Sequence, residues 1–190
     1  MKNILFLIVL IISVSCKAQQ VYPLNTDFDE IPQNSYLKDI NNELNTYVGT
    51  YKANFQNKEI ILYINKIEKK YFDMSSIKIY KDVLSIKFVV KNSSGNILQD
   101  TQNMNFQTNQ VQHTIYSLGT RTLDNIVGLS YGGTNCSVGN GLIYLKKINA
   151  TQISWEYLPN DIILDDSRCP PGTDITIYLP ETKDLIFTKQ

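Results

Sequence analysis

Histidine is almost absent from this chain: His113 is the only one among 190 residues. A single histidine excludes histidine-rich metal sites and would leave a Ser-His-Asp triad dependent on that one side chain. Charged residues make up only 19% of the chain, and 18 basic side chains balance 18 acidic ones. Without a basic excess or a basic cluster, the composition argues against nucleic acid as a partner.

Long apolar runs are also absent, except near the start, where consecutive apolar residues extend from Ile4 to Ile12. Lys2 precedes this run, and Ser13-Val14-Ser15 follows it. A positive start, an apolar core and then small residues are typical of a secretory signal peptide, and the run is far shorter than the roughly 20 residues that span a bilayer. Residues 1–15 are therefore predicted to be a signal peptide that exports the chain.

The residues Ser13-Val14-Ser15-Cys16 resemble a bacterial lipobox, and the junction that continues through Lys17 and Ala18 is similar to those of Bacteroidota lipoproteins. The resemblance implies that Cys16 is lipidated and becomes the first mature residue. Such a lipid would hold the protein at a membrane of the cell envelope, as an outer-membrane or periplasmic lipoprotein. The alternative is ordinary signal-peptidase cleavage after Ala18, which would leave no anchor.

The three cysteines fit an exported protein. If Cys16 carries lipid, Cys136 and Cys169 remain as an even pair in an oxidising compartment, and we predict a disulfide between them. Two separate buried thiols are the alternative. Removal of residues 1–15 leaves 175 residues, the length of one domain, with 17 basic and 18 acidic side chains.

The mature chain divides into a tether and one domain. Residues 16–34 are polar, contain Pro23 and Pro32 and show no sustained periodicity, so they are predicted to be the lipidated terminus and its tether. Apolar residues then recur at helical spacing, which predicts a short amphipathic helix over 35–46 with Asn34 or Ser35 as its N-cap. The apolar positions are Leu37, Ile40, Leu44 and Tyr47.

From about residue 47 onward the apolar period changes to two, the period of β-strands with one buried face. Turn residues separate the runs, as at Ser94-Gly95-Asn96, and no long helical pattern interrupts them. We therefore predict an all-β domain over 35–190, an antiparallel meander that forms a barrel, with a β-sandwich as the alternative. The alternating sets are Ile60, Leu62 and Ile64; Leu84, Ile86, Phe88 and Val90; Val111, His113 and Ile115; Ile153, Trp155 and Tyr157; Ile175, Ile177 and Leu179; and Leu185 and Phe187, with further strands at Ile126–Tyr131 and Gly141–Ile148.

The segment Val48-Gly49-Thr50-Tyr51, directly after the predicted helix, carries two resemblances. It resembles the opening of an uncharacterised family of short Bacteroidota lipoproteins, a domain of unknown function whose members read V-G-T-W or V-G-T-Y. It is also similar to the Gly-x-Trp entry into the first strand of lipocalin-like barrels, with Tyr51 in place of the Trp. The second resemblance implies a lipocalin-like barrel with a short helix before its first strand, and neither implies an activity.

The single histidine and the cysteines give little support for catalysis or metal binding. His113 is predicted to share a strand face with Val111 and Ile115, which favours a partly buried structural residue. The chain has no Gly-x-Ser-x-Gly elbow for a triad. A zinc site built from His113, Cys136 and Cys169 lacks a tight ligand pair, and export favours oxidation of the thiols. We predict no metal and no cofactor.

Two loops contain candidate site residues. The glycine-rich segment Gly132–Gly141 lacks the Lys-Ser/Thr ending and the following helix of a phosphate loop, so it is predicted to be a long hairpin connection. The acidic residues Asp161, Asp165 and Asp166 are candidates for calcium binding or carboxylate catalysis, but they have no EF-hand spacing. A solvated loop anchored by Cys169 is the simpler interpretation.

The sequence thus predicts a non-catalytic envelope lipoprotein whose β domain binds a small or apolar ligand or an envelope protein. Within a barrel, the mouth is the expected ligand site, and Tyr51, Tyr63 and Trp155 are the candidate lining residues. A periplasmic hydrolase that uses carboxylates or serine is the second hypothesis. An immunity-type partner protein is the third.

Overall fold

The computed structural model describes residues 18–107, 109–167 and 169–190. The predicted signal peptide and the predicted lipidation site Cys16 therefore lie outside the described residues. Along the chain the strands are β1 (Val21–Pro23), β2 (Tyr36–Lys38), β3 (Gly49–Phe55), β4 (Lys58–Met74), β5 (Ile77–Asn92), β6 (Ile97–Asp100), β7 (Ile115–Arg121), β8 (Ile126–Tyr131), β9 (Gly141–Lys147), β10 (Gln152–Pro159) and β11 (Leu185–Lys189). Single 3-10 turns lie at Phe28–Glu30, Leu44–Tyr47, Thr122–Asp124 and Asn135–Ser137.

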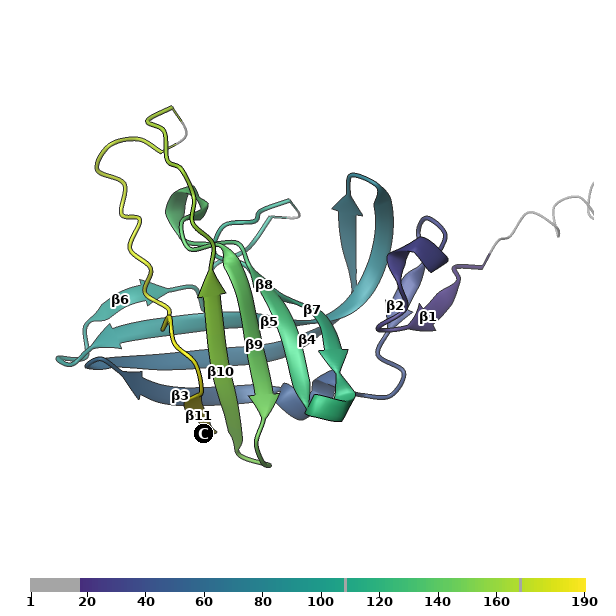
Figure 1. The fold of residues 1–190 in the computed structure, drawn as a ribbon, viewed down its shortest axis with the longest axis horizontal. Helices are drawn as coiled ribbons and strands as arrows, with labels where there is room; N and C mark the ends of the chain where they lie inside the picture. Colours follow the sequence, from purple (N-terminus) through teal and green to yellow (C-terminus); the bar gives the residue numbers. More distant parts are fainter. Residues whose placement is uncertain (1–17, 108, 168) are drawn as a thin grey trace, which may run out of the picture.

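Eight of the strands in the described residues form a closed antiparallel barrel (Figure 1). Around the barrel, the order of hydrogen-bonded strands is β3-β4-β5-β7-β8-β9-β10-β11, and β6 pairs with β5 outside this circle. The last strand, β11, pairs with β3 through Thr188 opposite Lys52. The pairing of Ser85 on β5 with Tyr116 on β7 completes the circle. The prediction of an all-β meander forming a lipocalin-like barrel is confirmed. Because the pairing runs without a break around the circle, the alternative of two stacked sheets is wrong.

The interior of the barrel is a packed core. The alternating residues predicted on β4, β5 and β10 are almost completely inaccessible to solvent, as is Phe187 on β11. Aromatic rings fill much of the space: Trp155 lies 5.7 Å from Phe187 and 6.3 Å from Tyr157, and Tyr157 lies 5.9 Å from Tyr131, measured between ring centroids. An eight-stranded barrel is just wide enough for side chains to fill, and here they do.

Both ends of the barrel are covered by the chain itself. Leu24, Leu44 and Tyr47 are buried against the core at the end where β3 begins. At the other end, the segment between β10 and β11 crosses the opening and packs Ile177 and Leu179 against the same core. The indole N–H of Trp155 donates to the carbonyl of Pro180 at 2.9 Å and so fixes this covering segment. Within the described part of the chain, both openings of the barrel are therefore covered.

The N-terminal segment differs from the prediction. The helix expected over 35–46 is not found: Tyr36–Lys38 is a strand parallel to β1 and β5, and Leu44–Tyr47 is one 3-10 turn. Leu37 is buried by this strand pairing, whereas Ile40 is 55% exposed, so the helical spacing of apolar residues was coincidental. The predicted tether is also folded over its described part, because β1 pairs with β2 and Leu24 and Ile31 are buried. No described helix has the length and apolar character needed to cross a membrane.

One predicted strand is absent, and another is shorter than expected. Ile175, Ile177 and Leu179 alternate in sequence, but they lie in the covering segment, which pairs with no neighbouring strand as part of the sheet. The strand predicted from Val111 starts only at Ile115. Residues 111–114 form a turn, in which the N–H of Thr114 donates to the carbonyl of Val111 at 3.2 Å.

Two buried carboxylates join the N-terminal segment to the barrel. Asp82 accepts hydrogen bonds from the Tyr36 hydroxyl (2.6 Å) and from the backbone N–H groups of Asp39 (3.0 Å) and Lys69 (2.9 Å). Burial alone would raise the pKa of Asp82, but these hydrogen bonds outweigh it and hold the pKa below its usual value. Asp39 accepts from the N–H of Glu43 and Leu44, and its carboxylate forms a 2.8 Å ion pair with Lys66.

A buried lysine lies beside this junction. Lys81 on β5 is only 6% exposed, and its ammonium donates to the carbonyl of Leu118 at 2.6 Å and lies 5.6 Å from the ring centroid of Phe28. Burial lowers the pKa of Lys81 from 10.5 to about 8. The pKa of Lys70, directly opposite on β4, is lowered for the same reason.

Replacement of this lysine, Lys81→Met, should remove a pH dependence of stability. Between about pH 8 and pH 10 the unfolded chain still holds the Lys81 proton while the folded protein has released it, so the free energy of unfolding should rise by about 2 kcal/mol as the pH increases. Urea unfolding of the wild type and the variant at pH 7.5 and pH 9.5 measures this rise. The rise in the wild type should exceed that in the variant, and an equal change in both proteins would contradict the assignment.

Candidate functional site

The aromatic residues predicted to line the barrel do not come together around a cavity. Tyr51 and Trp155 are fully buried in the core, and the Tyr51 hydroxyl has no hydrogen-bond partner among the described residues. Tyr63 pairs with Thr50 and Lys87 and lies on the outside of the barrel, half-buried. Sequence alone cannot separate an aromatic side chain that fills a core from one that lines a pocket.

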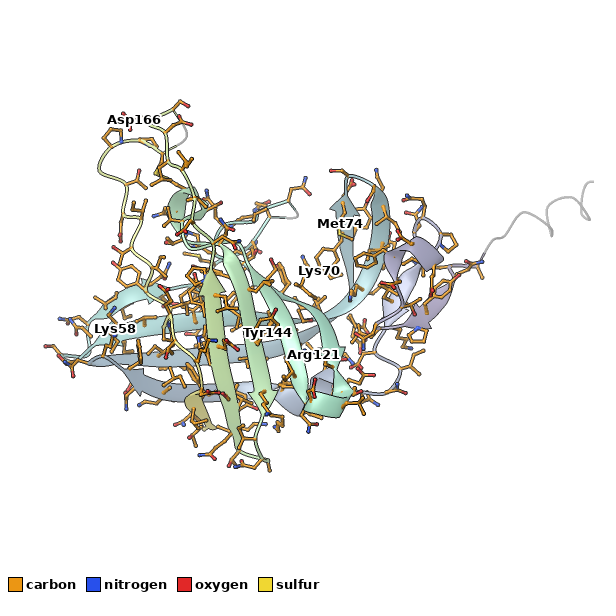
Figure 2. All side chains as sticks on the ribbon, viewed as in Figure 1. Lys58, Lys70, Met74, Arg121, Tyr144 and Asp166 are labelled. Carbon is orange, nitrogen blue, oxygen red and sulfur yellow. A yellow bond between two sulfur atoms is a disulfide. The ribbon has the colours of Figure 1, made fainter. Side chains whose placement is uncertain are left out.

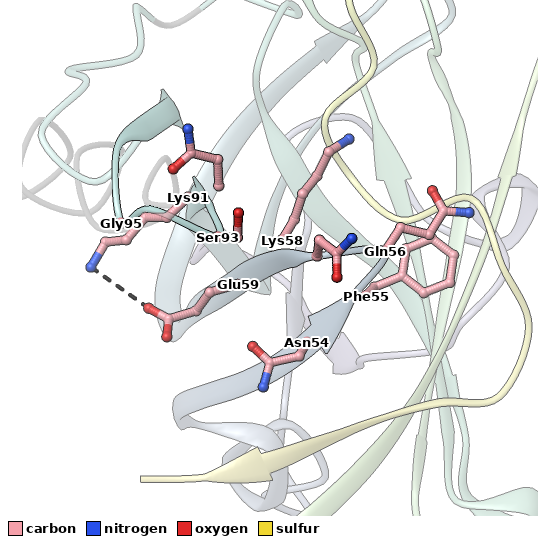
Figure 3. A pocket seen from close by; sticks show the side chains of 10 residues that line it. Asn54, Phe55, Gln56, Lys58, Glu59, Lys91, Ser93 and Gly95 are labelled. Atoms are coloured by element: carbon pink, nitrogen blue, oxygen red, sulfur yellow. Dashed lines mark ion pairs between the residues drawn. The ribbon is translucent and has the colours of Figure 1, made fainter.

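A groove of about 500 Å³ lies on the outside between two hairpin tips, and we call it the tip groove (Figure 3). Its residues are Asn54–Glu59, at the β3–β4 turn, and Lys91, Asn92, Ser93 and Gly95, at the β5–β6 turn. Figure 1 places these turns at the end of the long axis opposite β1 and β2. The tip groove was not predicted from the sequence.

Local sequence explains the conformation of the two turns. Gln56 and Asn57 both have positive φ angles, 46° and 60°, as a two-residue hairpin turn with the twist of its strands requires, and Asn tolerates this conformation. In the second turn the side chain of Asn92 accepts hydrogen bonds from the N–H groups of Ser94 and Asn96, and Gly95 has a φ of 81°. The Asn57 turn and the Asn92–Gly95 turn were the signals that could have indicated this groove.

Charges on the wall of the tip groove are paired. The carboxylate of Glu59 binds Lys52 through one oxygen. Its other oxygen lies 3.7 Å from the ammonium of Lys91, the ion pair drawn in Figure 3. The hydrogen bond from Lys52 is the largest influence on Glu59 and lowers the pKa of its carboxyl. Lys58 lies 6.0 Å from the ring centroid of Tyr178 in the covering segment.

The tip groove offers hydrogen bonds but no set of catalytic groups. Asn54, Gln56 and Asn57 are exposed amides, which present donors and acceptors together. Ser93 has no histidine beside it, because His113 lies elsewhere: its Nε2 is 3.1 Å from the Asn135 side-chain oxygen and its Nδ1 is 3.4 Å from Gln99. An activated serine needs an adjacent base, so these residues suit binding rather than nucleophilic chemistry.

The predicted disulfide is present in the structure. Cys136 and Cys169 are bonded with their Cα atoms 5.5 Å apart, and the bond joins the glycine-rich connection between β8 and β9 to the loop after β10. Asn135 strengthens this link, since its amide donates to the carbonyl of Asp174 at 2.8 Å. The two sulfurs are therefore not available as thiolate ligands for zinc. No group of three metal-ligating side chains occurs in residues 18–107, 109–167 and 169–190.

The acidic residues predicted as alternative candidates lie on the loop that the disulfide anchors. Asp161, Asp165 and Asp166 are all exposed, and the Asp165 side chain accepts the N–H of Ser167 at 2.8 Å. Figure 2 shows Asp166 at the outer tip of this loop, away from the barrel. The exposed loop therefore does not bring these three carboxylates together in a buried cleft, the usual setting of carboxylate catalysis.

Comparison with known proteins gives a family but no activity. A family model described as a family of unknown function, DUF6705, matches residues 1–190. No curated protein and no solved structure matches the chain.

Loss of the disulfide in the double variant Cys136→Ser, Cys169→Ser should destabilise the domain without unfolding the barrel. The bond joins two residues that are 33 positions apart in the sequence. For a loop of this length the chain-entropy model gives a loss of about 4 kcal/mol in the free energy of unfolding. Urea unfolding measures the loss, and wild-type protein treated with a reductant is the matched control that should coincide with the variant. Equal stability of oxidised wild type and variant would show that the bond contributes nothing.

Proposed function

The chain belongs to the DUF6705 family, whose function is unknown, and we propose that it is an exported, lipid-anchored binding protein without catalytic activity. The packed interior of the barrel carries this proposal. With the core filled and both ends covered, a ligand cannot occupy the position that lipocalin-like barrels use, so binding must take place on the outer surface. The signal-like N-terminus and Cys16 support export and anchoring.

The partner that fits best is an envelope protein that presents a polar segment to the tip groove. The groove is lined by amides and by the ion pair of Glu59 with Lys91, and Glu59 is also bound by Lys52 outside the groove. This lining suits hydrogen bonding and charged contacts more than apolar burial. Its walls are turns whose conformation is set by local sequence, so little ordering cost arises on binding. The groove also lies at the end of the molecule farthest from the N-terminal strands, where an anchored protein is accessible (Figure 1).

The hydrolase hypothesis has less support. Its carboxylates are exposed on a loop, and the serine of the tip groove has no base beside it. We therefore propose binding alone.

Photocrosslinking in intact cells tests the proposed interface. A benzophenone amino acid at Gln56 or at Ser93 should give the same protein adduct, because both positions lie in the tip groove. The matched controls are Leu123 and Ile163, which are 99% and 100% exposed on other parts of the surface and should not give that adduct. Glu59→Gln, which frees the two lysines, should reduce the adduct roughly tenfold, as loss of an interface contact worth 1–2 kcal/mol does.

Absence of an adduct from both groove positions would refute the tip groove as the interface. The same product from all four positions would show that the contact is not specific to this groove.

A further inference from the structure

A row of tyrosines crosses the small sheet that projects outside the barrel. The register places Tyr71 on β4 opposite Tyr80 on β5, and Tyr80 opposite Tyr36 on β2. On the next strand Val21 pairs with Tyr36 and is 51% exposed. Paired residues lie on the same side of a sheet, so these four side chains share one face. The term tyrosine face is used below for these four residues together with Lys69.

A β-bulge directs Lys69 across this face. The bulge interrupts the pairing of β4 with β5 between Ile67 and Lys70, and Lys69 there has a φ of 53°. Bulges commonly redirect a side chain in this way. The Lys69 ammonium lies 5.7 Å from the ring centroid of Tyr36 and 5.6 Å from that of Tyr80. It has no ion pair with a carboxylate among the described residues.

The other charges on this side largely cancel. Asp73 and Lys78 share the tyrosine-bearing side of the hairpin and pair with each other at 3.4 Å. Lys38 and the buried Asp82 also lie on this side, two residues from Tyr36 and from Tyr80. The exposed Glu68 precedes Lys69 in the bulge, but the Lys69 ammonium is the charge that lies over the rings. An anionic group near the ring row would meet this ammonium first.

The chain leaves the domain beside the same face. Ala18 and Gln19 line a groove that Tyr80 also lines. The side-chain amide of Gln19 donates to the carbonyl of Asn34 at 2.8 Å, and the N–H of Tyr36 donates to the carbonyl of Gln20 at 2.8 Å. These bonds fix the chain up to position 19. Cys16 is only two residues before Ala18, and two residues span at most about 7 Å.

We propose that the tyrosine face rests directly on the phospholipid headgroups of the membrane that holds the anchor. The proposal rests on lipidation of Cys16, which belongs to the proposed function. A lipid attached within about 7 Å of the groove leaves no free spacer, so this side of the domain must meet the headgroup layer. Tyrosine is enriched at the membrane interface, because its ring is apolar and its hydroxyl is polar.

The remaining residues of the face suit the same surface. The Lys69 ammonium provides a contact for lipid phosphate, and a lysine near an anionic membrane contributes about 1 kcal/mol. Val21, at the outer edge of the sheet, provides apolar area at the boundary with the acyl chains. Docking then fixes the orientation of the domain as well as its attachment.

Depth-dependent fluorescence quenching tests this docking. The full-length protein, purified with its native N-terminus, is reconstituted into vesicles of phosphatidylethanolamine and phosphatidylglycerol, with or without a lipid that carries a nitroxide near the headgroup. A Val21→Trp variant should lose at least half of its added fluorescence when the quencher is present. Ile163→Trp, on the loop that the disulfide anchors, is the matched control and should lose none. Wild-type fluorescence from the buried Trp155 gives the baseline.

A charge reversal identifies the role of the lysine. In the Val21→Trp background, Lys69→Glu should reduce the quenching at least twofold, whereas Lys183→Glu, at an exposed lysine near the start of β11, should leave it unchanged. Equal effects of the two reversals would remove Lys69 from the contact.

The outcomes separate the two proposals. If the Val21→Trp variant stays with the vesicles after a carbonate wash but its added fluorescence is not quenched, docking is overturned and the lipid anchor stands; the face would then be available to another partner, such as a glycan. Protein that is released from native membranes with a free Gln19 N-terminus would overturn the anchored function and docking with it.

Discussion

The hydrogen bonds that converge on Asp82 are the constraint on which the arrangement of this molecule depends. Its carboxylate lies opposite the bulge in β4, where the strand pairing would otherwise leave the Lys69 N–H without a partner. The same carboxylate accepts hydrogen bonds from the Tyr36 hydroxyl and the Asp39 N–H, so it fixes β2 and the turn that follows. Asp39 in turn orients the chain toward Leu44, which covers one end of the barrel. Two buried carboxylates thus connect the N-terminal segment, the bend of the long hairpin and the closure of the core. Because a buried carboxylate is costly without such partners, loss of any one donor would weaken the whole set.

The filled interior decides where function can lie. Trp155, Tyr51, Tyr157, Phe88 and Phe187 are the largest fully buried side chains, and all five lie in the barrel. A lipocalin-like barrel that binds a ligand keeps this volume open, whereas here aromatic side chains occupy it and the chain covers both openings. The barrel therefore acts as a rigid support that displays turns and loops. Binding residues are commonly located on loops held by such a support, which agrees with the position of the tip groove.

Sequence periodicity predicted the parts of the fold that depend on one buried face. The alternation of Ile60, Leu62 and Ile64, and of the corresponding residues on β5 and β10, was confirmed because each of these strands has the core on one side. The spacing of apolar residues gave a wrong prediction where the side chains are buried by elements other than the one predicted. Leu37 and Leu44 matched a helix by spacing, but the first is buried by strands and the second by the barrel end. The covering segment alternates like a strand because Ile177 and Leu179 face the core, although residues 175–179 form none of the described strands. The candidate site was not predicted: its two turns are recognisable in the sequence, but their proximity depends on the register of β3, β4 and β5.

The two surfaces proposed for contact lie at opposite ends of the same long hairpin. The barrel part of β5 from Val83 to Asn92 is about 30 Å long at the usual rise per residue, and the tyrosine face lies beyond its start. Because the strands between them are part of a closed barrel and cannot fold back, the two surfaces stay about that far apart along the hairpin. Contact of the tyrosine face with a membrane therefore does not cover the tip groove. On the proposed function, attachment to the membrane and binding of a partner can take place at the same time, because they use different residues.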